Sequence, residues 1–178
     1  MKTKTQALIR KYATAFVDVV LEVPSRDEIV SEIVSMLDVF EQTDLATSLS
    51  SISLSSEQKA QLLGIFQENS STYVRNFLEV IKQNGREELL YPILLDIRST
   101  VSRRTNQFDV TVQTVVPLSE EQKAALSRIA EARFGIQTRQ IVETIDEELI
   151  GGFVLAANNK VIDTSIKSQL HAFKQTMK

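Results

Sequence analysis

The chain has 178 residues, 43% of them hydrophobic, with a formal net charge of −3 and no cysteine. This length and apolar content fit one domain or two small ones and exclude a disordered protein. The acidic balance argues against a nucleic-acid binder that works through overall charge, and the lack of cysteine excludes disulfides and thiolate chemistry. We identify no signal peptide and no apolar run near the roughly 20 residues that span a bilayer.

The first 105 residues follow a helical period throughout. Apolar residues recur every three to four positions in the segments 4–22, 25–40, 44–49, 55–68, 72–83 and 88–101. Ser25 with Glu28, and Ser55 with Gln58, have the spacing of capping boxes, which satisfy free amides at a helix start. Pro92 is tolerated if its helix begins about four residues earlier, because the first helical amides have no partners to lose. The pattern predicts five or six helices packed as a bundle.

Each of these segments has a predicted buried face. We expect these faces to contain Leu8, Tyr12, Phe16 and Val19 in the first helix, widened by Ile9, Ala13 and Val20. The second helix should bury Ile29, Ile33, Met36, Leu37 and Phe40, and residues 72–83 should bury Tyr73, Val74, Phe77, Leu78 and Ile81. Asn84-Gly85 is a typical helix end. Periodicity leaves two roles open for Tyr12, Ala13 and Phe16, since side chains in the core and in a binding groove repeat with the same spacing.

The period changes near Asn106. Residues 108–114 alternate between apolar and polar side chains, as in a half-buried strand, and residues 137–144 predict a second strand. Between them, Ser119 with Gln122 opens a helix expected to bury Ala125, Leu126, Ile129 and Phe134 and to end at Gly135. The last third is therefore a small α+β unit, with its boundary at residues 104–107. The similar segments 54–60 and 118–124 are two similar helix starts and not a repeat.

Residues 142–170 form the most distinctive stretch. Gly151-Gly152 precedes a short apolar strand, Phe153 to Ala157, and Asn158-Asn159 turns the chain, since Asn tolerates left-handed backbone angles. Val161-Ile162 extends again, which predicts a β-hairpin. A final helix follows, capped by Asp163, Thr164 or Ser165 and expected to bury Ile166, Leu170 and Phe173.

The sequence contains no convincing catalytic, cofactor or metal site. His171 is the one histidine and has no nucleophile or second ligand nearby in sequence. Gly151-Gly152 lacks the spacing of a phosphate loop and precedes a strand, so a bulge or tight hairpin is the better interpretation. The acidic residues 146–148 are interpreted as a solvated turn, and Asp163 as a helix cap. An enzyme or nucleotide-binding module built on the glycines and Asp163 is the rival class, and it predicts stabilisation by a nucleotide or metal.

Four motifs occur in a recognisable order. Three are weak alone: Tyr12-Ala13-x-Ala15-Phe16, Phe77-Leu78-x-x-Ile81-x-x-Asn84-Gly85-Arg86, and Val115-x-Pro117-Leu118-Ser119-x-x-Gln122. The fourth is specific: Gly151-Gly152-Phe153, then Val161-Ile162-Asp163-x-Ser165-Ile166-Lys167. Together they resemble, over the whole chain, the δ subunit of F-type ATP synthases, the family of the mitochondrial oligomycin-sensitivity-conferring protein. Asn158-Asn159-Lys160 is a mild departure at the hairpin tip, where the family often has a glycine.

The resemblance implies a non-catalytic stator subunit. Residues 1–105 would form a six-helix bundle on the α3β3 catalytic head, and residues 106–178 an α+β domain that holds the b subunits of the peripheral stalk. The protein would stop the head turning with the rotor, so that proton-driven rotation is coupled to ATP synthesis. It would need no cofactor, small-molecule substrate or nucleic acid, and would lie on the cytoplasmic side of a bacterial cell membrane, attached only through the complex.

The resemblance also assigns residues. The N-terminal helix of an α subunit would bind a groove that involves Tyr12, Ala15, Phe16 and Val80, while Gly151, Gly152, Phe153, Asp163 and Ser165 form the structural signature. A free-standing helical adaptor or regulatory binding protein is the alternative, and identification of the partner would separate the two.

Overall fold

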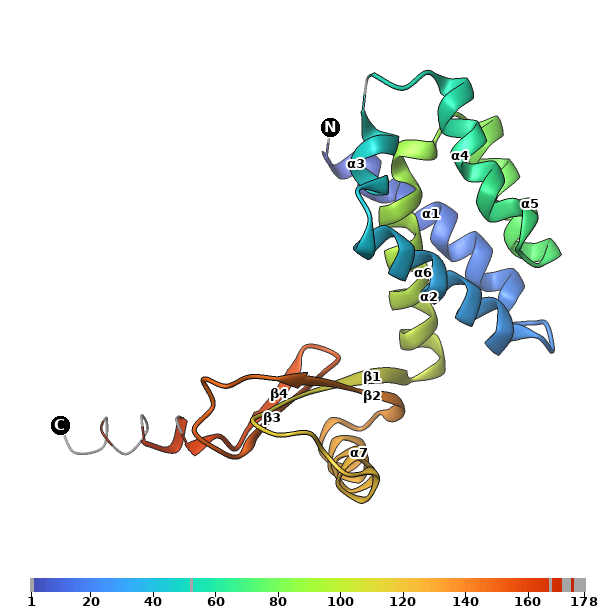
Figure 1. Ribbon diagram of the computed structural model, residues 1–178. Helices are drawn as coiled ribbons and strands as arrows, with labels where there is room; N and C mark the ends of the chain where they lie inside the picture. The colour runs from blue at the N-terminus through green and yellow to red at the C-terminus, as the bar shows by residue number, and fades with distance from the viewer. Residues whose placement is uncertain (1, 52, 167, 171–173, 175–178) are drawn as a thin grey trace. The chain divides into compact units, whose positions relative to one another are not determined.

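The computed structural model describes residues 2–51, 53–166, 168–170 and 174 (Figure 1). The chain divides into two compact units, Met1–Val101 and Ser102–Lys178. Over the described residues it is mainly helical, with one four-stranded sheet in the second unit. The expected fold class, mainly α with a smaller α+β part, is confirmed at this level.

Helices make up the N-terminal unit. They are α1 (Lys2–Val20), α2 (Arg26–Gln42), α3 (Leu45–Ser50), α4 (Ser56–Glu68), α5 (Thr72–Gln83), the 3₁₀ helix η1 (Glu87–Leu89) and α6 (Leu90–Thr105). With α7 of the second unit, α1–α7 and η1 make eight helices before the helical residues at the end of the chain are counted, so their number alone does not define a six-helix bundle. Pro92 is the third residue of α6, where its missing amide costs no helical hydrogen bond.

Local signals explain where several helices begin and end. At α4 the Gln58 amide donates to the Ser55 hydroxyl (3.2 Å) and the Ser55 amide to the Gln58 side chain (2.9 Å), which confirms the predicted capping box. Gly85 follows α5 with φ +58°, a left-handed angle that suits glycine. The prediction at α2 was wrong. Ser25 makes no capping hydrogen bond, because it lies in a turn closed by the Arg26 amide on the Val23 carbonyl rather than in the extended conformation of a cap.

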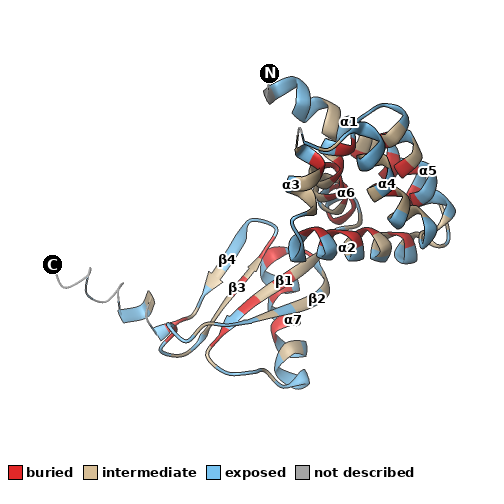
Figure 2. Ribbon diagram, turned by 45° about the horizontal axis from the view of Figure 1, so that its top comes forward, coloured by how far each residue is buried: buried red, intermediate tan, exposed pale blue. Residues whose placement is uncertain are grey.

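The core of this unit is held together by aromatic contacts between helices. The rings of Phe16 in α1 and Phe77 in α5 lie 4.6 Å apart. Phe40 in α2 stacks on Phe66 of α4 (6.0 Å) and on Tyr91 of α6 (5.3 Å). Figure 2 shows buried residues along one side of α2 and exposed residues on the other, the arrangement expected of an amphipathic helix.

The predicted buried faces are confirmed for α2 and need correction elsewhere. Val19 in α1 and Tyr73 in α5 are 51% and 38% exposed. The buried side of α1 contains Ala13 and Val20, as predicted, and also Val17, which was not predicted. The apolar faces of α1 and α5 are thus wider than the parts that the core covers.

The C-terminal unit is a βαβ unit extended by a hairpin. Its elements are β1 (Gln107–Thr114), α7 (Glu120–Phe134), β2 (Gln137–Ile145), β3 (Phe153–Ala157) and β4 (Lys160–Asp163). The strand order is β2-β1-β3-β4; β1 and β2 are parallel, and the other neighbours are antiparallel. The parallel pair follows from the crossover through α7, which the short links at both of its ends allow.

One face of the sheet packs on α7. Val110 and Val112 of β1 and Leu155 of β3 are fully buried there, together with Ala130 of α7. The capping box at Ser119 is confirmed, and Gly135 ends α7 in the left-handed conformation. Ala125 and Ile129 were expected in this core but are exposed, because Leu126, Ala130 and Phe134 form the side of α7 that faces the sheet.

The end of the chain departs most from expectation. Asn158 and Asn159 have φ of 48° and 59°, as in the two-residue turns that suit the twist of a hairpin. Helix begins at Ile166, but Ile166 and Leu170 are 43% and 51% exposed and are not buried as predicted. Lys167, His171 and Phe173 lie outside the described residues.

Candidate partner-binding surfaces

The side chains predicted to bind a partner helix lie on α1 and α5, which meet at the Phe16–Phe77 contact. Phe16 is 8% exposed and belongs to the core, Tyr12 is half-buried against it, and Ala15 is exposed. Val80, on α5, is 45% exposed. The four predicted contact residues therefore differ in exposure: Phe16 is buried, Tyr12 is half-buried, and Ala15 and Val80 are on the surface.

Two further apolar residues extend this surface and were not predicted as partner contacts. Val19 on α1 lies four positions after Ala15, and Tyr73 on α5 lies seven positions before Val80, so each pair falls on one side of its helix. We call Ala15, Val19, Tyr73 and Val80 the α1–α5 strip. The signal for Val19 and Tyr73 was present in the sequence as apolar periodicity, but it was assigned to the core.

A polar network fixes the position of α5 against α4. The Glu79 carboxylate accepts hydrogen bonds from the side chains of Gln67 (3.2 Å), Lys82 (3.2 Å) and Gln83 (3.3 Å). The hydrogen bond from Gln67, followed by those from Lys82 and Gln83, lowers the pKa of Glu79 below its ordinary value. Because Gln67 belongs to α4, the network joins the two helices beside the α1–α5 strip.

The glycine signature is a backbone clamp. The Gly151 carbonyl accepts from the Ile166 amide (3.0 Å), and the Phe153 carbonyl accepts from both the amide (3.0 Å) and the hydroxyl (2.9 Å) of Thr164. Gly152 has φ +82°, and a Cβ there would lie 2.4 Å from the Thr164 carbonyl oxygen. Only glycine permits this approach. The expected bulge or hairpin turn is thus corrected to a bend that holds residues 163–166 against the start of β3.

Ser165 and Asp163 together form the cap that follows. The Ser165 hydroxyl accepts from the Ser168 amide (3.2 Å), and Asp163 accepts from the Ser165 amide (2.8 Å) and the Ser168 hydroxyl. These bonds confirm the cap predicted for this position. The hydrogen bond from the Ser168 hydroxyl, and then those from Ser165, lower the pKa of Asp163.

Ser168→Ala is expected to raise the pKa of Asp163 toward its ordinary value, because it removes the hydrogen bond with the largest effect. Because the pKa of Asp163 is lower in the folded than in the unfolded state, its ionised form stabilises the fold at pH values above the unfolded-state pKa. This stabilisation is lost as the pH falls through the folded-state pKa. NMR titration of the Asp163 carboxyl carbon measures the shift, with Ser127→Ala in α7 as the control. An equal Asp163 pKa in all three proteins would contradict this account of the cap.

Exposed apolar residues gather in the segments that adjoin the clamp. Ile145 ends β2, Ile150 immediately precedes the glycines, and Ile166 and Leu170 lie at the start of the terminal helix; they are 43% to 68% exposed. Ile166 contacts the glycine bend, since its Cδ1 would lie 2.9 Å from a Cβ at Gly151. We call these four residues the clamp surface. The sequence analysis expected Ile166 and Leu170 to be packed in the terminal helix and made no prediction for the exposure of Ile145 and Ile150.

Among the described residues, no group of three or more His, Cys, Asp or Glu side chains could hold a metal ion. The Asp146 carboxylate is half-buried and accepts from the Glu148 amide (3.0 Å), in a turn where Glu147 and Glu148 are exposed. No described helix is long and apolar enough to cross a bilayer. Each unit instead exposes a group of apolar side chains, the α1–α5 strip in the first and the clamp surface in the second. Exposed apolar surfaces of this kind are typical of proteins that bind other proteins.

Comparison with known proteins agrees with this class. Residues 8–177 match the family model described as ATP synthase delta (OSCP) subunit. The chain is 48% identical over 178 residues to ATP synthase subunit delta of Streptococcus thermophilus and 44% identical to that of Streptococcus gordonii, in both cases across the full length of both chains. A chain in the structure of the Toxoplasma gondii mitochondrial ATP synthase hexamer shares the fold, with a TM-score of 0.72, 17% identity and coverage of 96% of this chain and 97% of that one.

The fold and its exposed apolar surfaces fit a protein that binds other proteins. The chain belongs to the ATP synthase delta (OSCP) subunit family. It is accordingly a stator subunit of the peripheral stalk, and it carries no active site of its own.

Proposed function

We propose that this subunit joins the catalytic head to the b subunits of the peripheral stalk, so that the head is held while proton-driven rotation is coupled to ATP synthesis. In this proposal residues 1–105 act as the family's six-helix bundle and bind the head, and residues 106–178 bind the stalk. Family membership over nearly the whole chain and the division into two compact units support it.

The observation that carries the head contact is the α1–α5 strip. Its apolar side chains are exposed above a rigid floor, the Phe16–Phe77 contact. An amphipathic helix such as the N-terminal helix of an α subunit can bury an apolar face on such a surface without the bundle having to rearrange. Ala15 and Val80 would touch the partner directly, Tyr12 would border it, and Phe16 would support it from below.

The clamp surface supports the stalk contact. Ile145, Ile150, Ile166 and Leu170 expose apolar area in a unit whose own core is small. Burying them against the C-terminal ends of the b subunits would remove apolar surface from water and complete the packing of the terminal helix.

Two attachments on one chain explain how the joint can resist torque with modest contacts. Once one unit is bound, the other is confined near its partner, and its effective concentration rises to the millimolar range for a short connection. The subunit would be located on the cytoplasmic side of a bacterial membrane through these partners alone, with no cofactor, substrate or nucleic acid.

Isothermal titration of the full chain with a peptide of the α-subunit N-terminal helix tests the head contact, and titration with the C-terminal half of a b subunit tests the stalk contact. We expect both to bind, and to bind simultaneously. Failure of both would favour a free-standing adaptor with other partners and would overturn the stator assignment of these surfaces.

A further inference from the structure

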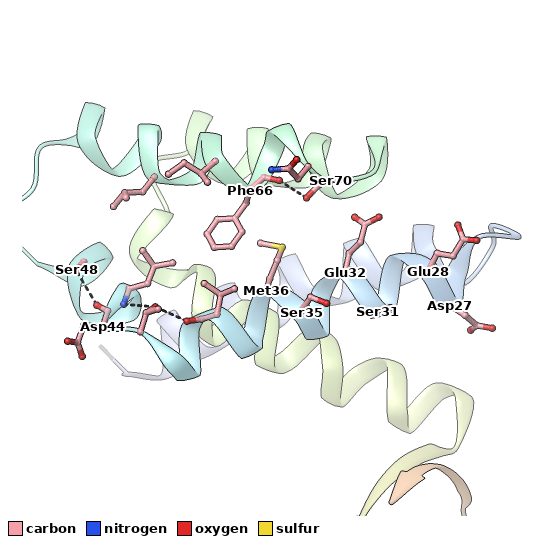
Figure 3. Close-up of a pocket in the computed structure, with 16 residues that line it drawn as sticks. Asp27, Glu28, Ser31, Glu32, Ser35, Met36, Asp44, Ser48, Phe66 and Ser70 are labelled. Atoms are coloured by element: carbon pink, nitrogen blue, oxygen red, sulfur yellow. Dashed lines mark hydrogen bonds between the residues drawn. The ribbon is translucent and has the colours of Figure 1, made fainter. Parts of the chain in front are cut away.

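A second groove lies on the N-terminal unit, between α2 and α4 and closed at one end by α3 (Figure 3). It has a volume of about 1170 Å³. It uses a different pair of helices from the α1–α5 strip, and no part of the proposed head or stalk contact explains it.

The floor of this groove is apolar and firmly supported. Met36 of α2 and Phe66 of α4 point toward each other across it, and Phe66 stacks on the buried Phe40 at 6.0 Å. Val39 and Ile65 stand at its sides, 41% and 62% exposed. Exposed aliphatic side chains such as Val39 and Ile65, next to well-packed residues, are typical anchor points for a binding partner.

Both walls follow helical spacing. The α4 wall consists of Leu62, Ile65, Phe66 and Asn69, and the α2 wall of Glu28, Ser31, Glu32, Ser35, Met36 and Val39. On α2 the lining runs over 13 residues, from Asp27 to Val39, and at a rise of 1.5 Å per residue this gives the groove a length of about 20 Å. Three to four turns of a helix have this length, and an elongated groove between two helices is the form that binds amphipathic helices.

The rim of the groove is acidic. Its lining, as far as the described residues go, contains the carboxylates of Asp27, Glu28, Glu32 and Asp44 and no Lys or Arg, although Asp27 pairs with Arg26 just outside the lining (3.0 Å). Three of the four lie in the first seven residues of α2, so the negative charge is concentrated at one end. The Glu32 carboxylate also accepts from the Ser71 amide (3.0 Å), which fixes its position beside the groove.

We propose that this groove binds a second partner helix, amphipathic and basic, with an apolar stripe on the Met36–Phe66 floor and Lys or Arg side chains toward Asp27, Glu28 and Glu32. Charge complementarity selects this occupant. An anionic lipid surface or a nucleic acid would be repelled by the same carboxylates. The inference stands apart from the proposed head and stalk contacts.

Two matched peptides of about 18 residues test the proposal on the full chain. They share one leucine stripe at helical spacing, and the remaining face carries Lys in the first peptide and Glu in the second. We expect the Lys peptide to bind at least tenfold more tightly at low salt, with the difference shrinking as salt is added. Equal affinity for the two peptides, or no binding of the Lys peptide, would overturn the proposal.

Three variants locate the binding. Ile65→Asp is expected to weaken binding of the Lys peptide at least tenfold, whereas Val80→Asp, on the α1–α5 strip, should change it less than twofold. Asp27→Lys/Glu28→Lys is expected to reverse the preference in favour of the Glu peptide. All three changes are at exposed positions, and thermal unfolding checks that the bundle is intact. Loss of binding in Val80→Asp but not in Ile65→Asp would place the peptide on the α1–α5 strip and refute a second site.

Discussion

Gly152→Ala is expected to lower the free energy of unfolding of the C-terminal unit by about 2–5 kcal/mol, one of the largest single-residue effects in this chain. The new methyl group meets two penalties at once. The residue has φ +82°, a region that side chains disfavour, and its Cβ would lie 2.4 Å from the Thr164 carbonyl oxygen and 3.0 Å from the Ser165 Cα. Both obstacles are backbone, so no side-chain rotation relieves them. Amide hydrogen exchange of β1 and β3 measures the loss unit by unit.

Gly64→Ala is the matched control for this prediction. Gly64 lies within α4, and no atom lies within 4 Å of a Cβ built there. Alanine favours helix over glycine by about 0.5–1 kcal/mol, so this variant should be slightly more stable than the parent. Gly151→Ala should fall between the two, since the obstacle there is the end of the Ile166 side chain, which can move. Equal stability of Gly152→Ala and the parent would refute the clamp.

The sequence predicted this glycine pair as important but not its geometry. Adjacent glycines before an apolar strand are compatible with a bulge, a hairpin turn or a bend, because glycine permits all three. The contact with Thr164, 12 positions after Gly152, decides between these conformations. The amide and the hydroxyl of Thr164 both donate hydrogen bonds to the Phe153 carbonyl. The hydrophobic period of a segment predicts its secondary structure but not which distant segment it contacts. The contact between the glycine bend and Thr164 could therefore not be predicted from the sequence pattern.

The boundaries of helices and strands were easier to predict from the sequence than the side chains that each of them buries. Local signals located the helix starts at Ser55 and Ser119, the ends at Gly85 and Gly135, and the switch from helix to strand near Asn106. These depend on residues a few positions apart. Whether an apolar side chain is covered depends on what packs against it, and that is where Val19, Tyr73, Ile129, Ile166 and Leu170 were misjudged.

These errors share a direction that bears on function. Each residue was expected in the core and is exposed. In a protein that works by binding, apolar periodicity marks both the surface covered on folding and the surface covered on assembly. Four of the five misjudged residues lie on these two surfaces: Val19 and Tyr73 belong to the α1–α5 strip, and Ile166 and Leu170 to the clamp surface. The mispredictions are thereby linked to the proposed partners.

Val80→Asp is expected to weaken binding of the α-subunit N-terminal helix by about 2 kcal/mol, or roughly 30-fold, because a carboxylate would be buried in an apolar contact without a partner. Val80 is 45% exposed in the free chain, so the bundle itself should keep its stability to within about 0.5 kcal/mol. Isothermal titration of the full-length variant gives the affinity, and thermal unfolding gives the stability.

Val39→Asp is the control that makes this result specific. Val39 has a similar exposure, 41%, and the same side chain, but it lies on α2 in the second groove. It should leave the affinity for the α-subunit helix within about twofold, since changes at distant surface sites act independently. Equal losses in the two variants would mean that the head helix does not bind selectively on the α1–α5 strip. Loss in Val39→Asp alone would transfer the head contact to α2 and α4, and with it the role that we assign to a second partner.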